Sequence, residues 1–452
     1  MKGMVLSHVF FIVNLAYLNE NRLPLNLIKH ESLDIMLSGR DEEAKMNIKE
    51  IKKDIFMLSM DIDDMLFESM WELPKGVSLN SFIIKGKKTA IVDGLIGWEG
   101  TPETLYQELS KLDINPEDID VVVINHMEPD HSGWLEDFKK INDHFTIYTS
   151  QKSVDLLDAF YDHQLNIEVV KEGDTLDLGQ GKSLSFYPIP NVHWPETMMT
   201  LEHSSKVLMT CDMFGAFGQL KDQCFYEDMS KEDQEDFKLE ITRYFSNVLA
   251  TFSTMVDRAN QKAKQLDVDI IAPGHGPLYK NPSNIIDIFD HHCQFAKGYG
   301  KNKITILWGS MYGMTEMAVK HLQAFLSKQD IEVKSIHLPY DSESDALTNV
   351  FDSAGVILAA PTYEYKLFPP MVHALDELGR KRVTNKEVFR FGSFGWSGGA
   401  EKELNHLMEH HKMKWNFLEN VEFKGKPGEN DFKQIEERAM QLIKNMQGKI
   451  IQ

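Results

Sequence analysis

The segment His126-Met127-Glu128-Pro129-Asp130-His131 constrains this chain more than any other part of its sequence. It places four side chains that can bind metal within six positions, directly after the apolar run 121–124. A buried imidazole or carboxylate costs free energy unless it is paired or bound to a metal. The segment therefore predicts a metal-binding loop at the end of a buried strand, and we interpret it as half of a two-metal site.

Three further candidate ligands lie at equivalent places, each just after an apolar strand: His193, Asp212 and His275. A lone histidine at a strand end is usually a hydrogen-bonded core or loop residue. Here four histidines and three carboxylates occupy such positions in four segments, which favours metal binding. A carboxylate can bridge two cations and lower their mutual repulsion, so Asp212, which stands alone in its segment, is expected to bridge. Imidazole and carboxylate ligands without thiolate suit non-haem iron or manganese as well as zinc.

Short strands and helices follow one another from Met46 onward, with turn signals between them. The apolar run 121–124 is expected to be a strand that is covered on both faces. The predicted strands of this part are 51–58, 81–84, 89–92, 121–124, 183–187, 206–210 and 268–272, and helical periodicity covers 101–112 and 231–265.

Strands and helices alternate strictly after a shift in composition near residues 297–303. The five predicted strands are 304–308, 332–337, 355–359, 387–391 and 417–423, each followed by a helix. Five βα units in a row predict a doubly wound parallel sheet.

Three loops of this second part are candidates for binding a phosphorylated cofactor. The loop 309–316 follows a strand and opens a helix, and its hydroxyls at Ser310, Tyr312 and Thr315 can cradle a phosphate at the positive helix end. It lacks the lysine of a nucleoside triphosphate loop. The loops 360–365 and 393–399 also follow parallel strands, so they reach the same carboxyl edge of the sheet. Tyr363 or Trp396 can pack on a flat ring there, or can simply pack within its own loop.

The metal-binding loop resembles that of the metallo-β-lactamase superfamily, whose hydrolases carry H-x-H-x-D-H, although here Glu128 fills the third position. The H-x-E-x-D-H form, followed by H-W-P-E-T, C-D-M-F-G and P-G-H-G, is similar to the flavodiiron proteins (A-type flavoproteins) from about Met46 to the C-terminus. The resemblance implies a metallo-β-lactamase-like αββα sandwich over 46–298 that carries a diiron site. It also implies a flavodoxin-like, doubly wound five-stranded parallel sheet over 299–452 that binds FMN.

The resemblance further implies roles for individual residues. One iron would be bound by His126, Glu128 and His193, the other by Asp130, His131 and His275, and Asp212 would bridge them. Whether His131 binds iron directly or supports another ligand stays open. The FMN-binding residues that it implies are Ser310, Met311, Tyr312, Gly313, Met314, Thr315, Pro361, Thr362, Tyr363, Glu364, Tyr365, Ser393, Phe394, Gly395, Trp396, Ser397 and Gly398.

By the same resemblance, the function expected of the chain is that of an oxidoreductase. It would pass electrons from FMN to a non-haem diiron centre that reduces O₂ to water, NO to N₂O, or both, in O₂ or NO detoxification. The family forms a head-to-tail homodimer, or a dimer of dimers, in which the FMN of one subunit faces the irons of the other. No rubredoxin-like CxxC pair is present, so a separate rubredoxin or similar protein is the expected donor. The sequence does not decide between O₂ and NO.

Two alternatives from other functional classes stay open. A zinc hydrolase with an inherited flavodoxin-like tail would cleave a thioester or phosphoester, against which Glu128 and the three intact loops count. A non-catalytic electron carrier or redox sensor would have a vestigial metal site, against which the complete ligand set counts.

Composition bounds the partners and the cellular compartment. A net charge of −21 argues against nucleic acid and against anionic membrane surfaces. Three cysteines without a CxxC pair give neither a disulfide framework nor a cysteine-bound iron or zinc centre, which fits a reducing cytoplasm. The apolar stretch 5–18 is shorter than the roughly 20 residues that a spanning helix needs.

Two segments are interpreted as lying outside the functional sites. Residues 1–45 are predicted to be a disordered or loosely docked extension, or the product of a misplaced start, with Met46 as the true first residue. Arg380, Lys381, Arg382, Lys386 and Arg390 form a basic stretch. Because the helix after the third strand returns to the opposite end of the sheet from the flavin loops, we expect a solvated surface turn at 380–382.

Overall fold

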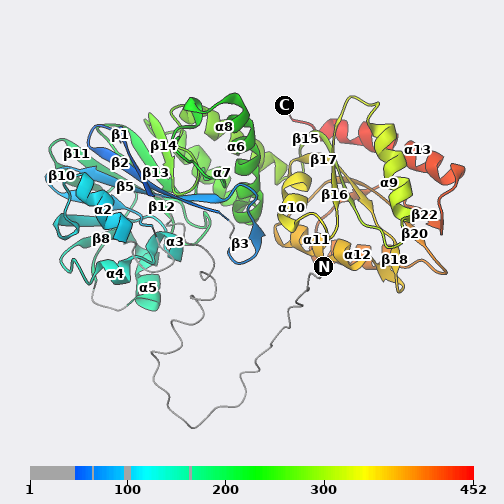
Figure 1. The fold of residues 1–452 in the computed structure, drawn as a ribbon, viewed down its shortest axis with the longest axis horizontal. Helices are drawn as coiled ribbons and strands as arrows, with labels where there is room; N and C mark the ends of the chain where they lie inside the picture. Colours follow the sequence, from blue (N-terminus) through cyan, green and yellow to red (C-terminus); the bar gives the residue numbers. More distant parts are fainter. Residues whose placement is uncertain (1–45, 64–65, 96–102, 162–164, 452) are drawn as a thin grey trace, which may run out of the picture. The chain divides into compact units, whose positions relative to one another are not determined.

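The computed structural model describes residues 46–63, 66–95, 103–161 and 165–451, which belong to one compact unit (Figure 1). The predicted extension over 1–45 and the first two residues of the predicted helix 101–112 lie outside the described residues. In the part of the chain that is described, no helix is both long enough and apolar enough to cross a membrane.

The first layer of strands is a seven-stranded mixed sheet in the order β1-β2-β5-β6-β7-β8-β9. Its strands are β1 (Met46–Lys52), β2 (Ile55–Ile62), β5 (Val77–Lys85), β6 (Thr89–Val92), β7 (Ile119–Ile124), β8 (Thr146–Ser150) and β9 (Asn166–Val170). Every residue of β7 except Asp120 is buried, because the parallel neighbours β6 and β8 flank it and other layers cover both of its faces. A short hairpin of β3 (Leu66–Phe67) and β4 (Trp71–Glu72) connects β2 to β5.

A second, five-stranded sheet packs against the first. It contains β10 (Thr175–Gly179), β11 (Lys182–Pro188), β12 (Met198–Glu202), β13 (Val207–Cys211) and β14 (Ile270–Pro273), in sequence order. The core between the two sheets includes Phe82 and Val123 from the first and Met209 from the second, all buried. The strands β13 and β14 run parallel, so their carboxyl ends lie side by side.

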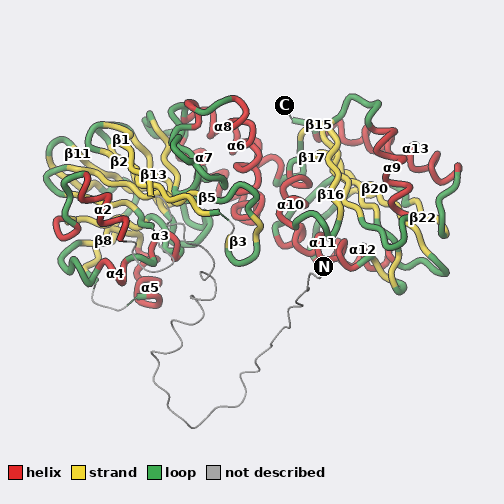
Figure 2. The backbone as a smooth tube through the Cα atoms, viewed as in Figure 1, coloured by secondary structure: helices red, strands yellow, loops and turns green. Residues whose placement is uncertain are grey.

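Helices cover the outer faces of both sheets, which confirms the predicted αββα sandwich (Figures 1 and 2). Those on the first sheet are α2 (Glu103–Lys111), α4 (Leu135–Phe138) and α5 (Gln151–Phe160), and those on the second are α6 (Lys231–Tyr244), α7 (Ser253–Ala263) and α8 (Pro282–Phe295). Each helix turns an apolar stripe inward, as Leu109 of α2 and Leu157 of α5 do.

The C-terminal part is the predicted doubly wound parallel sheet. Its strands are β15 (Lys301–Trp308), β16 (Glu332–His337), β17 (Ser353–Ala359), β20 (Glu387–Phe394), β21 (Asn416–Phe417) and β22 (Val421–Lys424), in the order β16-β15-β17-β20-β21, with β22 also paired to β20. Its helices are α9 (Met314–Leu326), α10 (Glu343–Phe351), α11 (Pro369–Arg380), α12 (Ala400–His410) and α13 (Glu429–Met446). α9 and α13 cover one face, and α10, α11 and α12 cover the other.

A buried polar network joins helix α6 to helix α10 of the doubly wound sheet. The Nε–H of Arg243 donates to Glu240 Oε2 at 3.1 Å, its Nη1–H donates to Ser344 Oγ at 3.0 Å, and its Nη2 lies 2.9 Å from Asp345 Oδ1. Asn247 Nδ2–H also donates to Ser344 Oγ, at 2.8 Å. Arg243 is 2% exposed, so its charge is balanced almost wholly by these partners.

The structure corrects three predicted elements. The strand predicted over 51–58 is wrong, because Asp54 turns the chain with φ 61° and separates β1 from β2. The single helix predicted over 231–265 is broken after α6 by a π-helical turn, Phe245–Leu249, and a 3₁₀ turn, Ala250–Phe252. The last strand, predicted over 417–423, is split into β21 and β22.

The basic stretch 380–390 is not one surface feature. Arg380 is exposed and paired with Asp376, but Lys386 is fully buried and donates to the carbonyl oxygens of Tyr299, Phe351 and Ser353. Arg390 is also buried, 2.8 Å from Glu422. Both side chains are buried because polar partners await them, three carbonyl oxygens for Lys386 and a carboxylate for Arg390.

We expect Arg243→Ala to lower the free energy of unfolding by about 3 kcal/mol, because it leaves Glu240 buried without its counter-charge. Denaturant titration followed by circular dichroism measures the change. The matched control is Arg258→Ala on the exposed side of α7, for which a change within about 0.5 kcal/mol is expected. Equal effects of the two substitutions would show that the buried network adds no stability.

Candidate metal centre

The metal-ligating candidates all lie where strands of the sandwich end. His126 and Glu128 follow β7, and Asp130 and His131 lie in the short helix α3 (Pro129–Ser132) that begins at the next proline. The others come from the second sheet: His193 from the loop between β11 and β12, Asp212 directly after β13, and His275 after β14. Neighbouring strands end together, so residues far apart in sequence meet at one edge of the sandwich.

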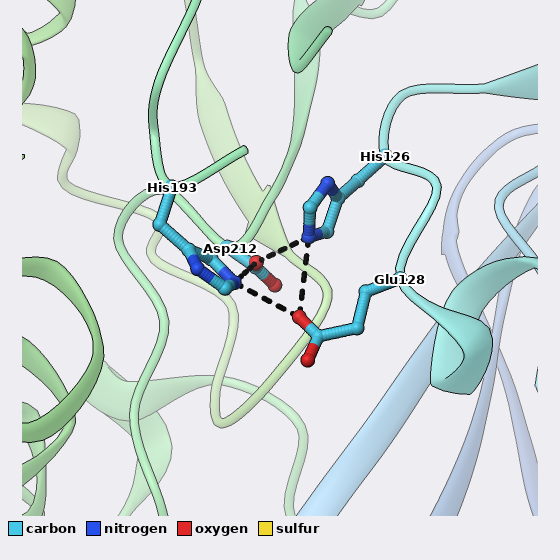
Figure 3. A group of neighbouring side chains, drawn as sticks. All are labelled: His126, Glu128, His193 and Asp212. Atoms are coloured by element: carbon cyan, nitrogen blue, oxygen red, sulfur yellow. Dashed lines mark hydrogen bonds and ion pairs between the residues drawn. The ribbon is translucent and has the colours of Figure 1, made fainter. Parts of the chain in front are cut away.

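Asp212 lies between two groups of imidazoles. Its Oδ2 is 3.1 Å from Nε2 of His126 and 3.1 Å from Nε2 of His193 (Figure 3). Its Oδ1 is 3.2 Å from Nε2 of His131 and 3.5 Å from Nε2 of His275. Each carboxylate oxygen therefore faces a different pair of histidines, which is the arrangement that a bridging ligand needs.

The remaining two carboxylates complete one group each. Glu128 Oε2 lies 2.9 Å from Nε2 of His193 and 3.2 Å from Nε2 of His126 (Figure 3). Asp130 Oδ2 lies 3.3 Å from Nε2 of His275 and 3.5 Å from Nε2 of His131. All seven candidate residues thus lie close together, in groups that correspond to those the resemblance implies.

The geometry fits metal ions better than hydrogen bonds between the side chains. Asp212 Oδ2 and both carboxylate oxygens of Asp130 are buried and make no hydrogen bond of acceptable geometry, although imidazole nitrogens lie close to them. Nε2 of His131 and Nε2 of His275 lie only 3.1 Å apart. Lone pairs that converge on shared points rather than on each other are typical of a metal site.

Neighbouring groups fix the tautomers of two imidazoles. His126 Nδ1–H donates to Glu196 Oε1 at 2.8 Å, and His275 Nδ1–H donates to the carbonyl oxygen of Ser78 at 3.1 Å. In both rings this leaves the Nε2 lone pair aimed at the centre. Glu196 Oε1 also accepts the backbone N–H of Met127 at 2.9 Å, which holds the ligand loop itself. Such supports orient a ligand and increase its basicity.

Charge interactions shift the pKa values of the candidate ligands. Burial alone would lower the pKa of the His275 imidazole, but the carboxylates of Asp130 and Asp212 close to its Nε2 raise it to about 10. His193, in contact with Asp212 and Glu128, has its pKa raised to about 9 in the same way. Burial would raise the pKa of Glu128, yet His126 and His193 lower it to about 2. Protons and metal ions compete for the same lone pairs, so metal binding must release protons and weaken as the pH falls.

Close packing around the ligands restricts what else can bind. A Cβ on Gly274 would lie 2.8 Å from Cε1 of His131, so only glycine fits before His275. The ring of Tyr244 packs against His275 with centroids 5.6 Å apart. Cys211 also lies beside His131 and Asp212, and burial raises the pKa of its thiol well above the usual value.

The sequence assigned no role to several residues that shape this centre. Glu196 was part of the quoted H-W-P-E-T segment, where a carboxylate three positions after a candidate ligand could have indicated a support. Ser78 and Tyr244 gave no local signal, because they reach His275 from distant elements. Asp93, fully buried and bonded to the backbone N–H of Asn125 at 2.7 Å, gave none either.

The three candidate cofactor loops also come together, at the carboxyl ends of β15, β17 and β20. The Oγ1 of Thr315 and the Oγ of Ser393 are 3.0 Å apart, which ties the first loop to the third. A Cβ on Gly399 would lie 2.2 Å from the carbonyl oxygen of Tyr365, so the second and third loops are in contact as well. The three candidate cofactor loops are therefore grouped at one edge of the sheet.

The loop edge has the features of a flavin phosphate site. Helix α9 begins after Gly313, whose φ is 82°, and no side chain caps its first turn, so N–H groups stay available to an anion. Thr362 Oγ1 is buried and unpartnered beside this edge. Tyr312, Trp396 and Tyr365 are 84%, 73% and 62% exposed, which leaves large rings free to contact a flat ligand.

We expect Glu196→Ala to weaken metal binding by about 10- to 100-fold, because His126 and the Met127 N–H both lose their acceptor. Competition with a chelator of known affinity measures the change. Glu136→Ala, at an exposed position of α4, is the control and should leave the affinity unchanged. Unchanged affinity in Glu196→Ala would show that the carboxylate does not support the ligands.

Comparison with known proteins agrees with this geometry. A family model described as ODP family beta lactamase matches residues 77–276. The anaerobic nitric oxide reductase flavorubredoxin of Shigella dysenteriae is 32% identical over 337 residues, which cover 73% of this chain and 68% of the relative. The protein of the same description from Vibrio vulnificus is 31% identical over 341 residues, which cover 74% and 67%.

Solved structures resemble the whole of the described fold. The rubredoxin oxygen:oxidoreductase of Desulfovibrio gigas has a TM-score of 0.81 at 23% identity, covering 89% of this chain and 99% of that one, which shows the fold. A variant of the flavo di-iron protein of Thermotoga maritima has a TM-score of 0.78 at 27% identity, covering 90% and 100%. Given relatives above 30% identity over two thirds of their length, a shared fold and a matching site, this chain belongs to the flavodiiron protein family.

Proposed function

We propose that this chain passes electrons from FMN to a non-haem diiron centre that reduces O₂ to water, NO to N₂O, or both, in detoxification of these gases. Its relatives carry the names nitric oxide reductase and oxygen oxidoreductase, which supports both substrates. We further assign residues 46–298 to the diiron part, 299–452 to the FMN part, and 1–45 to an extension of the chain.

The position of Asp212 carries this proposal. A single carboxylate with one oxygen facing His126 and His193 and the other facing His131 and His275 is built for two cations, not one. A site for one structural ion would be closed by four ligands around one point.

The seven converging residues would divide the work of holding two irons. One ion would be held by His126, Glu128 and His193, the other by Asp130, His131 and His275, with Asp212 shared. Two ferrous ions held there would bind the gas and supply two electrons together. The protein's own part would be to keep the two ions at fixed positions.

FMN fits the loop edge of the second sheet. The exposed N–H groups at the start of α9, with Ser310 and Thr315, would hold the phosphate. Residues 361–365 and 393–398 would line the isoalloxazine ring, with Tyr363 or Trp396 packed on it. FMN accepts electrons singly or in pairs, which suits a carrier between a one-electron donor and a two-metal site.

Exposed aromatic rings at the loop edge support a contact between subunits. Large aromatic side chains that gather on one surface mark sites of association. We propose a head-to-tail homodimer, or a dimer of dimers, in which this edge of one subunit faces the metal centre of the other. A separate rubredoxin or similar small protein in the cytoplasm would feed electrons to FMN.

The first experiment is metal and flavin analysis combined with O₂ and NO electrode assays on the reconstituted protein. We expect about two irons and one FMN per chain and consumption of at least one gas. Asp212→Asn keeps the shape but removes the shared charge, so iron content should fall and consumption should drop at least 100-fold. Asp143→Asn, at an exposed site, is the control.

Two outcomes would contradict the proposal. Zinc without flavin would favour a hydrolase of the metallo-β-lactamase type. Full loading with iron and FMN, but no consumption of either gas with a reducing system, would favour an electron carrier or sensor.

The subunit arrangement is tested by complementation. One subunit would carry Asp212→Asn, and the other would carry Ser310→Glu and Thr315→Glu, which repel the FMN phosphate. In a head-to-tail dimer, the intact FMN of the first subunit faces the intact irons of the second, so the mixed dimer should recover up to half of the activity. Homodimers of either variant are the controls, and an inactive mixed dimer would mean that electrons pass within one chain.

A further inference from the structure

The β3–β4 hairpin forms part of the wall of the metal centre. The ring of Phe67 is buried and meets His275 edge-on, with centroids 5.8 Å apart, and it also packs on Phe217 at 5.2 Å. Phe67 pairs with Trp71 across the hairpin, and Trp71 is 1% exposed. The hairpin is thus fixed at its base against a candidate ligand.

Glu68, the next residue after Phe67, lies at the exposed turn of this hairpin with φ 51°. Its carboxylate is not free to swing, because Trp71 Nε1–H donates to Glu68 Oε2 at 3.1 Å. On the other side, Lys381 Nζ lies 4.9 Å from the centre of the Trp71 ring. The exposed residue Glu68 is therefore held in place by the buried indole of Trp71, beside the metal centre.

The charges that act on Glu68 come from both parts of the chain. Partial burial of its carboxyl raises the pKa, and the negative charge of Glu128 raises it further. The positive charges of Lys381 and His193 and the hydrogen bond from Trp71 act in the opposite direction but do not cancel the rise. Glu68 thus responds to two candidate ligands of one iron while remaining open to solvent.

Other groups influenced by the ligands are less suited to exchange protons with water. Among the described residues, Asp93, Cys211 and Tyr244 respond to ligand charges but are buried. Tyr161 responds to Asp130, but burial raises the pKa of its hydroxyl, which is hydrogen-bonded to Ser132 Oγ at 2.8 Å. Glu68 is exposed, and its carboxyl group can both accept a proton and return it.

We propose that Glu68 carries protons from bulk water to the substrate bound at the metal pair, an inference that rests on the function proposed above. Reduction of O₂ to two waters consumes four electrons and four protons. Reduction of two NO to N₂O and water consumes two electrons and two protons. The electrons come from FMN and its donor, and each proton that Glu68 gives up is replaced from solvent.

Glu68→Gln is the central variant, because glutamine keeps the shape and can still accept the Trp71 indole N–H. We expect unchanged iron and FMN content, a turnover at least 10-fold lower with little change in KM, and partial rescue by added acetate. Glu72→Gln on the same hairpin, also exposed, is the matched control and should behave as the parent. The rate should fall at high pH, where Glu68 has lost its proton. Lys381→Gln removes a positive charge that lowers the pKa of Glu68, so this fall should move to higher pH.

A second readout does not depend on turnover. The ¹H–¹⁵N signal of the Trp71 indole, assigned with Trp71→Phe, should titrate with Glu68 in metal-free and zinc-loaded protein. We expect an inflection above the ordinary glutamate value of roughly 4.3 in the metal-free protein. The inflection should vanish in Glu68→Gln and move upward in Lys381→Gln.

The outcomes separate this inference from the proposed function. Parent protein that is loaded with iron and FMN but consumes neither gas overturns the proposed function. Active parent protein, with a Glu68→Gln variant of equal rate and equal pH profile, overturns the role of Glu68 alone. A slow Glu68→Gln variant that has lost iron, or that acetate does not rescue, assigns Glu68 a structural role and also overturns the inference.

Discussion

The carboxylate of Asp212, buried among four imidazoles, is the interaction on which the rest of this structure depends. A buried charge is costly unless it is compensated, and here the compensation comes from histidines on three separate segments of the chain. Those loops can converge only because β7, β13 and β14 end at one edge of the sandwich. The two packed sheets hold these loops together, and Gly274 allows the close approach of His131 that a larger residue would prevent.

The two sites differ in how far the protein alone organises them. At the metal centre, Glu196 and the Ser78 carbonyl orient the imidazoles, and the protein leaves little freedom to the ligands. At the carboxyl edge of the second sheet, the loops are fixed to one another through Thr315 and Ser393, but the aromatic rings stand in solvent. Rigid placement suits an ion with strict distance requirements, whereas a large flat ligand and a protein partner can order exposed rings as they bind.

Most of the strands and helices and all of the candidate ligands could be predicted from local sequence patterns. The features that were missed depend on contacts with distant parts of the chain. Strands β6 and β16 were predicted with their observed ends, since apolar runs and flanking turns mark them. The seven candidate ligands were visible because each follows an apolar strand. The turn at Asp54, the split between β21 and β22, and the burial of Lys386 were missed, since each depends on partners outside its own segment. The support from Ser78 comes from a strand nearly two hundred residues away from His275 in the chain.

Helix α6 ends with two neighbouring residues that serve different parts of the molecule. Arg243 is held by Ser344 and Asp345 of helix α10, and the next residue, Tyr244, packs against His275. Successive side chains on a helix point about 100° apart and share one rigid backbone. Arg243 and Tyr244 therefore cannot move independently, and one peptide unit connects the contact with α10 to the ring that packs on His275.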